Sequence, residues 1–204
     1  MIGVGNDPAR PTDEGFLVRS VPLVAVTAAV AGLGGVPRVD LDQRDITWFI
    51  STRNSSTNIS IYGRGIIDGN GRAALQPGNL GVNLLTSIYT TGFTVEGITF
   101  RESSSWAIMP TRSSNMTFRN LKMFNRFDMG ENDGIDVMES TGVTVTHAIG
   151  IGLDDPFSTK TWDDTVDLFR SVPGNPRPLD GVIFDDLVSW TYCYGINGPI
   201  TIMS

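Results

Sequence analysis

The sequence predicts an all-β protein whose strands wind into a parallel β-helix. Two observations support this fold class: turn-forming residues outnumber helix-forming residues, and one strand-and-turn pattern recurs five times. The 204 residues include 23 glycines and 17 aspartates but only five glutamates and two lysines. Glu and Lys favour helix surfaces, whereas Gly and Asp favour turns. The 40% of hydrophobic residues argues against disorder and can supply one substantial core.

The repeated unit is a turn residue, a run of alternating apolar positions, a polar corner and a second short strand. Its copies begin at Asn58, Gly92, Asn115, Gly142 and Gly181. The first inward-facing residues, separated by 34, 23, 27 and 39 positions, are then Ile59, Phe93, Met116, Val143 and Val182. The two shorter intervals are too long for a hairpin and lack the helix of a βαβ unit, but they fit one coil of a parallel β-helix. Residues one coil apart therefore become neighbours about 4.8 Å apart.

The domain organisation follows from this repeat. Residues 1–50 are expected to form a lead-in or capping segment, and residues 51–204 the coils. Loop insertions are predicted near residues 70–81 and 156–178, where turn residues interrupt the strand pattern. The last residues, 200–204, are strand-like and have no polar or helical cap. We therefore expect the solenoid to be incomplete at its C-terminus, and to be completed by further coils or a partner chain.

Charge and the rare residues limit the function classes. A net charge of −7 with scattered arginines offers no basic surface for a nucleic-acid backbone, so no nucleic-acid partner is expected. Cys193 is the single cysteine and His147 the single histidine. An intrachain disulfide and a CxxC metal site are thereby excluded, and His147 is interpreted as a ladder or surface residue. We expect no metal and no cofactor.

One apolar stretch, residues 21–36, has the length of a secretory leader's apolar region. It is interrupted by Pro22 and Gly32 and preceded by acidic residues, so it makes a poor leader and is too short for a membrane span. We interpret it as a buried strand. No clear N-terminal signal peptide is present in this interpretation, and no membrane partner is expected.

Two aspartate motifs carry the functional prediction. Asp133 precedes the pair Asp154 and Asp155 by 21 and 22 positions, which is close to one coil. The β-helix would place these carboxyl groups, with Asp136, on one outer edge, where mutual repulsion raises at least one pKa. Inverting glycosidases use such a division of roles, with a carboxylic acid and a carboxylate roughly 6.5–9.5 Å apart. The alternative is that Asp-Gly and Asp-Asp are ordinary turn dipeptides.

These residues also carry a family resemblance. Residues 132–136 (Asn-Asp-Gly-Ile-Asp) and the Asp154–Asp155 pair resemble the Asn-Thr-Asp and Asp-Asp motifs of glycoside hydrolase family 28, the polygalacturonases of the pectin-lyase-like superfamily. Residues 105–110 resemble the family's Trp-containing, Pro-terminated strand. The resemblance covers roughly residues 59–204. It implies a right-handed, single-stranded parallel β-helix that is truncated relative to the family.

The resemblance implies a role for each residue. Asp154 corresponds to the general acid, and Asp133 with Asp155 to the pair that orients and deprotonates water. The candidate substrate-binding residues are Asp136, Lys160, Trp162 and Asn197. Lys160 has two possible partners, a substrate carboxylate or an aspartate, and Trp162 either stacks on a sugar or anchors a loop.

The sequence departs from the family at groups that bind galacturonate. The Thr of Asn-Thr-Asp is missing, residues 195–198 (Gly-Ile-Asn-Gly) stand where Gly-His-Gly is expected, and no Arg-Ile-Lys follows. A dextranase- or isopullulanase-like α-glucan hydrolase is therefore an alternative.

Two alternatives belong to other classes. One is a non-catalytic carbohydrate-binding or adhesin β-helix. The other is a β-eliminating lyase, which would need Ca²⁺ and a base such as Lys160 or Arg126. The expected partner is a polysaccharide, and this function favours a secreted or extracytoplasmic location. Linkage, endo or exo action and oligomeric state stay open.

Overall fold

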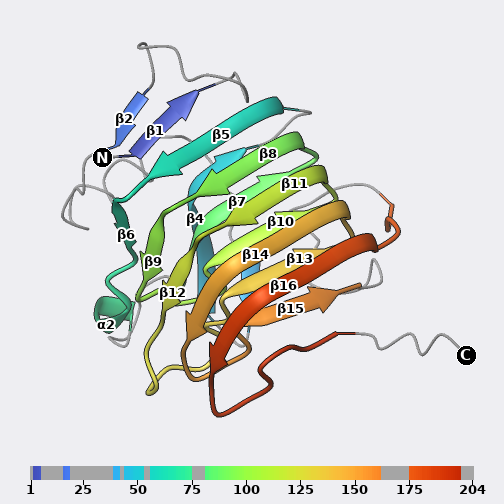
Figure 1. The fold of residues 1–204 in the computed structure, drawn as a ribbon. Coiled ribbons are helices and arrows are strands. Elements are labelled where there is room, and N and C mark those ends of the chain that lie inside the picture. The colour runs from blue at the N-terminus through green and yellow to red at the C-terminus, as the bar shows by residue number, and fades with distance from the viewer. Residues whose placement is uncertain are drawn as a thin grey trace, which may run out of the picture.

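The computed structural model confirms a nearly all-strand chain with parallel ladders, as the sequence predicts. The structure describes residues 2–5, 16–18, 39–41, 44–52, 56–74, 81–161 and 175–198. Figure 1 shows the coils stacked from β5 at one end to β16 at the other. Each coil passes through three faces, and equivalent strands of successive coils pair in parallel. The helix α2 (Gly71–Ala74) is the one helix in this part of the chain, and none there is long and apolar enough to cross a membrane.

The first two faces of the coil are joined into one ten-stranded sheet. The first face consists of β5 (Thr57–Gly63), β8 (Thr91–Glu96), β11 (Ser114–Arg119) and the first halves of β14 (Thr141–Ile151) and β16 (Asp180–Trp190). The second face consists of β6 (Ile66–Asp68), β9 (Thr99–Arg101), β12 (Lys122–Phe124) and the second halves of β14 and β16. Because β14 and β16 run unbroken around the corner, the two faces form a single sheet.

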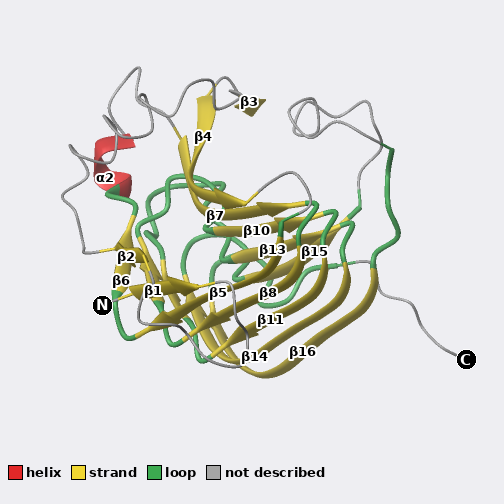
Figure 2. Cartoon of the chain, turned by 90° about the horizontal axis from the view of Figure 1, so that it is seen from above, coloured by secondary structure: helices red, strands yellow, loops and turns green. Residues whose placement is uncertain are grey.

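The third face is a six-stranded sheet that lies opposite the first face across the interior (Figure 2). It contains β4 (Arg44–Thr52), β7 (Gly81–Ile88), β10 (Ile108–Thr111), β13 (Ile135–Met138) and β15 (Phe157–Lys160), with β3 (Val39–Leu41) antiparallel to β4. At the other sheet, β1 (Ile2–Gly5) pairs antiparallel with β5 and with β2 (Phe16–Val18). The core between the faces is made of aromatic and aliphatic side chains such as Phe93, Phe118 and Val137.

Two of these strands bear on the predicted boundaries. β4 pairs in parallel with β7, so the third sheet includes residues before Ser51. β15 lies within the range 156–178, and it is a regular rung beside β13. The stretch 21–36, Trp162 and residues 200–204 lie outside the described residues, as do 75–80 and 162–174 of the predicted insertions.

The register confirms the repeat. Ile59 pairs with Phe93, Phe93 with Met116, Met116 with Val143, and Val143 with Val182. The five residues that open the copies all have positive φ, from 54° to 73°: Asn58, Gly92, Asn115, Gly142 and Gly181. Gly and Asn adopt this left-handed conformation most easily, which explains why the sequence alternates between these two residues at that position.

A second left-handed ladder marks the corner between the first and second faces. Its members, with φ of 79°, 53°, 53° and 50°, are Gly97, Asn120, His147 and Asp186. The His147 Nε2 atom lies 3.4 Å from Asp186 Oδ2, and both side chains are exposed. His147 is thus an exposed member of this corner ladder.

Candidate active site

Both aspartate motifs lie in the turns that lead from the second face into the third sheet. The first turn precedes β13 and the second precedes β15, one coil further on. The Gly134 backbone N–H donates to Asp155 O at 2.9 Å. Asp133 and Asp155 therefore stand on neighbouring rungs, and their separation along the sequence becomes adjacency in space. A Cβ atom on Gly134 would lie 2.3 Å from Pro156 O, which explains the Gly after Asp133.

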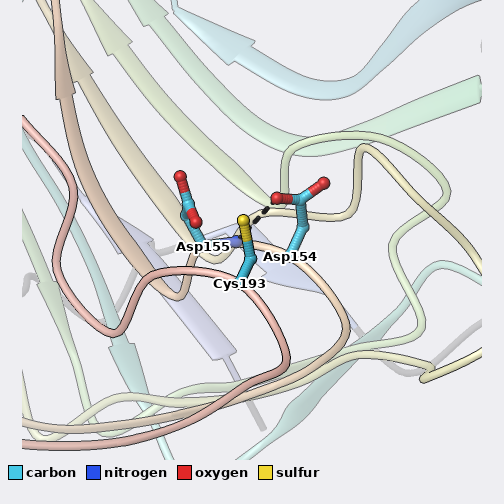
Figure 3. A group of neighbouring side chains, drawn as sticks. All are labelled: Asp154, Asp155 and Cys193. Atoms are coloured by element: carbon cyan, nitrogen blue, oxygen red, sulfur yellow. Dashed lines mark hydrogen bonds between the residues drawn. The ribbon is translucent and has the colours of Figure 1, made fainter.

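Asp154 occupies the half-buried position of the second turn. Its Oδ2 atom accepts a hydrogen bond from Glu131 N at 3.1 Å, and its Oδ1 atom accepts one from Asp155 N at 3.1 Å. Its own backbone N–H points to Asn132 Oδ1 at 3.4 Å. These contacts tie Asp154 to the turn that carries Asp133. Figure 3 shows Asp154 and Asp155 rising side by side from their turn.

Asp155 is held by the next stretch of chain. Tyr194 N donates to its Oδ1 atom at 2.9 Å, and the Asn197 side-chain amide donates to Oδ2 at 2.6 Å. Asn197 itself pairs with the third sheet through Phe157 and Ser158. Two N–H donors facing two oxygens suit a carboxylate, which only accepts hydrogen bonds. Asn197, a candidate substrate-binding residue, is thus brought into contact with Asp155.

Asp133, Asp136 and Lys160 form a buried cluster of charges. The Lys160 Nζ atom lies 2.8 Å from Asp133 Oδ2 and 2.7 Å from Asp136 Oδ1. It also lies 3.8 Å from the centre of a Trp106 ring. Because Ile135 and Val137 point into the core, Asp136 between them points out of the coil interior. It is nevertheless fully buried.

Burial and charge change the pKa values in this cluster. Burial raises the pKa of Asp133, and the charges of Asp136 and Asp154 raise it further, while Lys160 opposes the rise. Burial likewise raises the pKa of Asp136 against the effect of Lys160. For Lys160, burial alone lowers the pKa, but the two carboxylates outweigh it and the net shift is upward. The pair of carboxyl groups of Asp133 and Asp136 therefore retains a proton at pH values well above those at which an aspartate usually ionises.

Cys193 joins the edge of the site without having been predicted there. Its Sγ atom and carboxylate oxygens of Asp154 and Asp155 lie within 4.8 Å of one another. A hydrogen bond to Asp155 and, to a smaller extent, burial raise the pKa of the Cys193 thiol to about 11.

Coil spacing is the sequence signal that locates Cys193, and it locates Trp106 as well. Cys193 follows Asp154 at the same sequence separation at which Val182 follows Val143, its partner on the neighbouring rung. Trp106 precedes Asp133 at the same separation at which Met116 precedes Val143. Both residues therefore lie one coil away from a predicted aspartate.

The surface beside the turns combines a neutralised cation with aromatic rings. The Arg126 guanidinium donates to both carboxylate oxygens of Asp128 and lies 3.9 Å from Glu102. Phe127 and Tyr192 pack edge to face, with ring centroids 5.4 Å apart, and both are exposed. Trp162 lies outside the described residues.

Comparisons with known proteins agree with this geometry. A model of the family "Glycosyl hydrolases family 28" matches residues 31–172, a range that includes both aspartate motifs and Lys160 but not Asn197. No curated protein sequence matches.

Solved structures share the fold. A family 28 exopolygalacturonase of Yersinia enterocolitica superposes with a TM-score of 0.55 and 17% identity over 76% of this chain and 36% of that one. A polygalacturonase from Erwinia carotovora ssp. carotovora gives a TM-score of 0.60 and 18% identity over 78% and 46%. The chain thus spans less than half the length of these two proteins. Since the family model matches well over half of its 204 residues, with both acidic motifs inside the match, the chain belongs to glycosyl hydrolases family 28.

Proposed function

We propose that this chain is a polygalacturonase-like glycosidase that cleaves O-glycosidic bonds of a polysaccharide with inversion at the anomeric carbon. The observation that carries the proposal is the meeting of Asp133, Asp154 and Asp155 in two adjoining turns. Family membership supports the same reaction class.

Each aspartate has a place in the proposed reaction. The half-buried Asp154 is the general acid: its proton goes to the oxygen of the leaving sugar as the bond between that oxygen and the anomeric carbon breaks. Asp155 and Asp133 orient a water molecule on the opposite side of the ring. One of these two carboxylates takes a proton from the water while the water oxygen bonds to the anomeric carbon. Exchange with solvent then returns the proton to Asp154 and removes it from the base.

The contacts around Asp155 support its share of this role. The hydrogen bonds from Tyr194 and Asn197 fix the orientation of its carboxylate. A fixed carboxylate can hold water in one attack geometry at no further cost in side-chain entropy. The exposed rings of Phe127 and Tyr192 offer apolar surfaces on which sugar faces stack.

Polygalacturonate is the first candidate substrate, in keeping with the polygalacturonases that share the fold. A neutral α-glucan is the second, and a specific observation favours it. Lys160 is neutralised by Asp133 and Asp136, and Arg126 by Asp128. Neither cation is left to bind the carboxylate of a uronic acid.

The test is reducing-sugar release from polygalacturonate, dextran and pullulan, with the anomeric configuration of the first product determined by NMR. We expect hydrolysis of one polymer with inversion, and a loss of at least about 100-fold for Asp154→Asn, which removes the acid. Asp185→Asn, on the exposed first half of β16, is the matched control. Unsaturated products that absorb in the ultraviolet would instead indicate a lyase, and glycan binding without hydrolysis would indicate a binding module.

We further propose that the protein acts outside the cytoplasm, because polymeric substrates such as polygalacturonate do not cross membranes unaided. Fractionation of the producing cells tests this, and recovery of the protein solely from cytoplasm would contradict it.

A further inference from the structure

Lys160, Asp133 and Asp136, called the Lys160 cluster from here on, combine two acidic side chains with one basic side chain. The Lys160 side chain is 16% exposed, that of Asp133 4% and that of Asp136 0%. With both carboxyl groups ionised, the cluster would carry a net negative charge away from water. An uncompensated buried charge is costly, and such a group takes up a proton instead. One proton shared by the two carboxyl groups makes the cluster neutral.

Hydrogen-bond geometry distinguishes the two carboxyl groups. Lys160 Nζ donates a well-formed hydrogen bond to Asp133 Oδ2 at 2.8 Å. Its contact with Asp136 Oδ1 is as short, but it is poorly aligned, so neither oxygen of Asp136 has a well-formed hydrogen bond. A carboxylate without aligned donors is much more costly to bury than a neutral carboxyl group. The ionised partner of Lys160 is accordingly Asp133.

Both carboxyl groups have neighbours outside the cluster, and the effects of these neighbours are smaller than those of Lys160. On β15, Ser158 stands opposite Asp136 in the strand register, and its hydroxyl lowers the pKa of Asp136. Toward β10, the adjacent groups are Trp106, whose ring lies under the Lys160 ammonium, and Met109, one residue past the Ile108–Ile135 pair. The charge of Asp154 raises the pKa of Asp133, but by less than Lys160 lowers it. The ring of Trp106 stabilises the lysine as a cation and holds it in place.

We propose that Lys160 and Asp136 are positioning residues: Lys160 keeps Asp133 a carboxylate that can accept the proton of water, and Asp136 carries the proton that makes the buried cluster neutral. This inference deepens the proposed function. It replaces the expectation that Asp136 and Lys160 bind substrate, because the ammonium group of Lys160 is already engaged by two carboxyl groups and a ring.

The first test counts neutral carboxyl groups without any substrate. Protein labelled with ¹³C in its aspartates is titrated by NMR, and the side-chain resonances are assigned through the backbone. Within the cluster of Lys160, Asp133 and Asp136 we expect one neutral carboxyl group at pH 7, that of Asp136, and an ionised Asp133. Lys160→Met should add Asp133 as a second neutral carboxyl, whereas Lys160→Arg, which keeps the charge, should leave one.

The matched control is Lys122→Met, because Lys122 is the only other lysine of the chain and lies on β12. It should leave the count at one. A neutral carboxyl assigned to Asp133 at pH 7, or none in the cluster, would overturn the proposal. If Lys160→Met does not fold, the wild type and Lys160→Arg still decide the question.

The second test uses the acidic limb of kcat/KM against pH, once a hydrolysed polymer is known. Lys160→Met should move this limb to higher pH by at least about one pH unit, because Asp133 then ionises less readily. At pH values below the limb, kcat/KM should therefore fall by about tenfold. Asp136→Asn replaces a neutral group by another and should leave the limb where it is. A rise in KM for Lys160→Met with an unmoved limb would mean that Lys160 binds substrate. Absence of hydrolysis would contradict the proposed function alone, because the NMR count needs no substrate.

Discussion

At the scale of single residues, Gly134 sets how closely the two acidic turns approach. Its backbone passes so near Pro156 O that an added Cβ would lie 2.3 Å away. Gly134→Ala should therefore push the turns apart, destabilise the fold by about 1–3 kcal/mol and reduce hydrolysis more than stability explains. Urea unfolding and the reducing-sugar assay measure the two effects. Gly130→Ala is the control, because a Cβ there meets nothing within 4 Å; equal effects of both changes would refute the steric argument.

A second residue-scale prediction concerns proton uptake on folding. In the folded protein, burial raises the pKa of Asp136 and of Asp133. At pH values above the usual pKa of a carboxyl group, the folded state therefore binds more protons than the unfolded state. Stability must then fall as pH rises through this window, by up to about 1.4 kcal/mol per pH unit for one proton. Asp136→Asn removes the exchangeable proton and should flatten the slope.

Urea unfolding at several pH values between 5 and 8 measures this slope for both proteins. Unfolding free energies of wild type and Asp136→Asn that run parallel across this range would show that Asp136 takes up no proton on folding.

The spacing of the aspartates is enough to predict that Asp133, Asp154 and Asp155 meet, because one coil of sequence converts into one rung. The same conversion places Cys193 and Trp106 at the site, although no motif singles them out, since their separations from the aspartates match those of paired strands. The partners of Lys160 cannot be predicted from the sequence. Its charge allows either a substrate carboxylate or an aspartate, and only the side-chain directions on β13 and β15 decide between them.

At the scale of elements, the turns from the third sheet into the next coil form a left-handed ladder of polar residues. Tyr89, Arg112 and Glu139 have φ of 51°, 49° and 44°. Arg112 Nε donates to Glu139 Oε2 at 2.7 Å, and both side chains are buried. The Arg177 backbone also donates to this carboxylate, at 3.2 Å. The ladder therefore links three successive coils through charges that are withdrawn from water.

Glu139→Ala should cost about 3–5 kcal/mol, because it breaks a buried, hydrogen-bonded ion pair by removing the carboxylate to which Arg112 Nε donates. Replacing both residues by Met should restore part of that loss, since both charges of the buried pair are then removed together. Glu96→Ala breaks the exposed pair with Arg119 and should cost about 0–1 kcal/mol. Chemical unfolding of the four proteins tests the argument, which fails if Glu139→Ala is as mild as Glu96→Ala.

Strands of the first face are predictable because each opens with a left-handed Gly or Asn and then alternates apolar and polar positions. The strands of the third face are harder to predict from the sequence. β15 falls within a predicted insertion, since Pro156 and the turn residues after Lys160 hide a short strand. β13 and β10 are buried on every residue and show no alternation, so their pattern does not reveal which side faces the core.

At the scale of the whole molecule, the stack of coils ends in an open edge within the described residues. β16 pairs with β14 on one side, and several of its large apolar side chains are exposed, including Ile183 at 53% and Trp190 at 68%. An unpaired strand edge with exposed apolar side chains is a template for pairing with another chain. Asp185 and Asp186 near the middle of β16 oppose a symmetric pairing through like charge.

We therefore predict that the 204-residue polypeptide self-associates weakly and in a concentration-dependent manner through β16. Trp190→Lys should lower this association, because a charge on an edge strand disfavours pairing. Phe124→Lys is the matched control: Phe124, Ile151 and Trp190 occupy one ladder, but the strand of Phe124 is paired on both sides. Sedimentation velocity over a range of concentrations measures the effect. If both changes reduce association equally, exposed apolar area rather than the open edge drives it, and if neither does, β16 is not the contact.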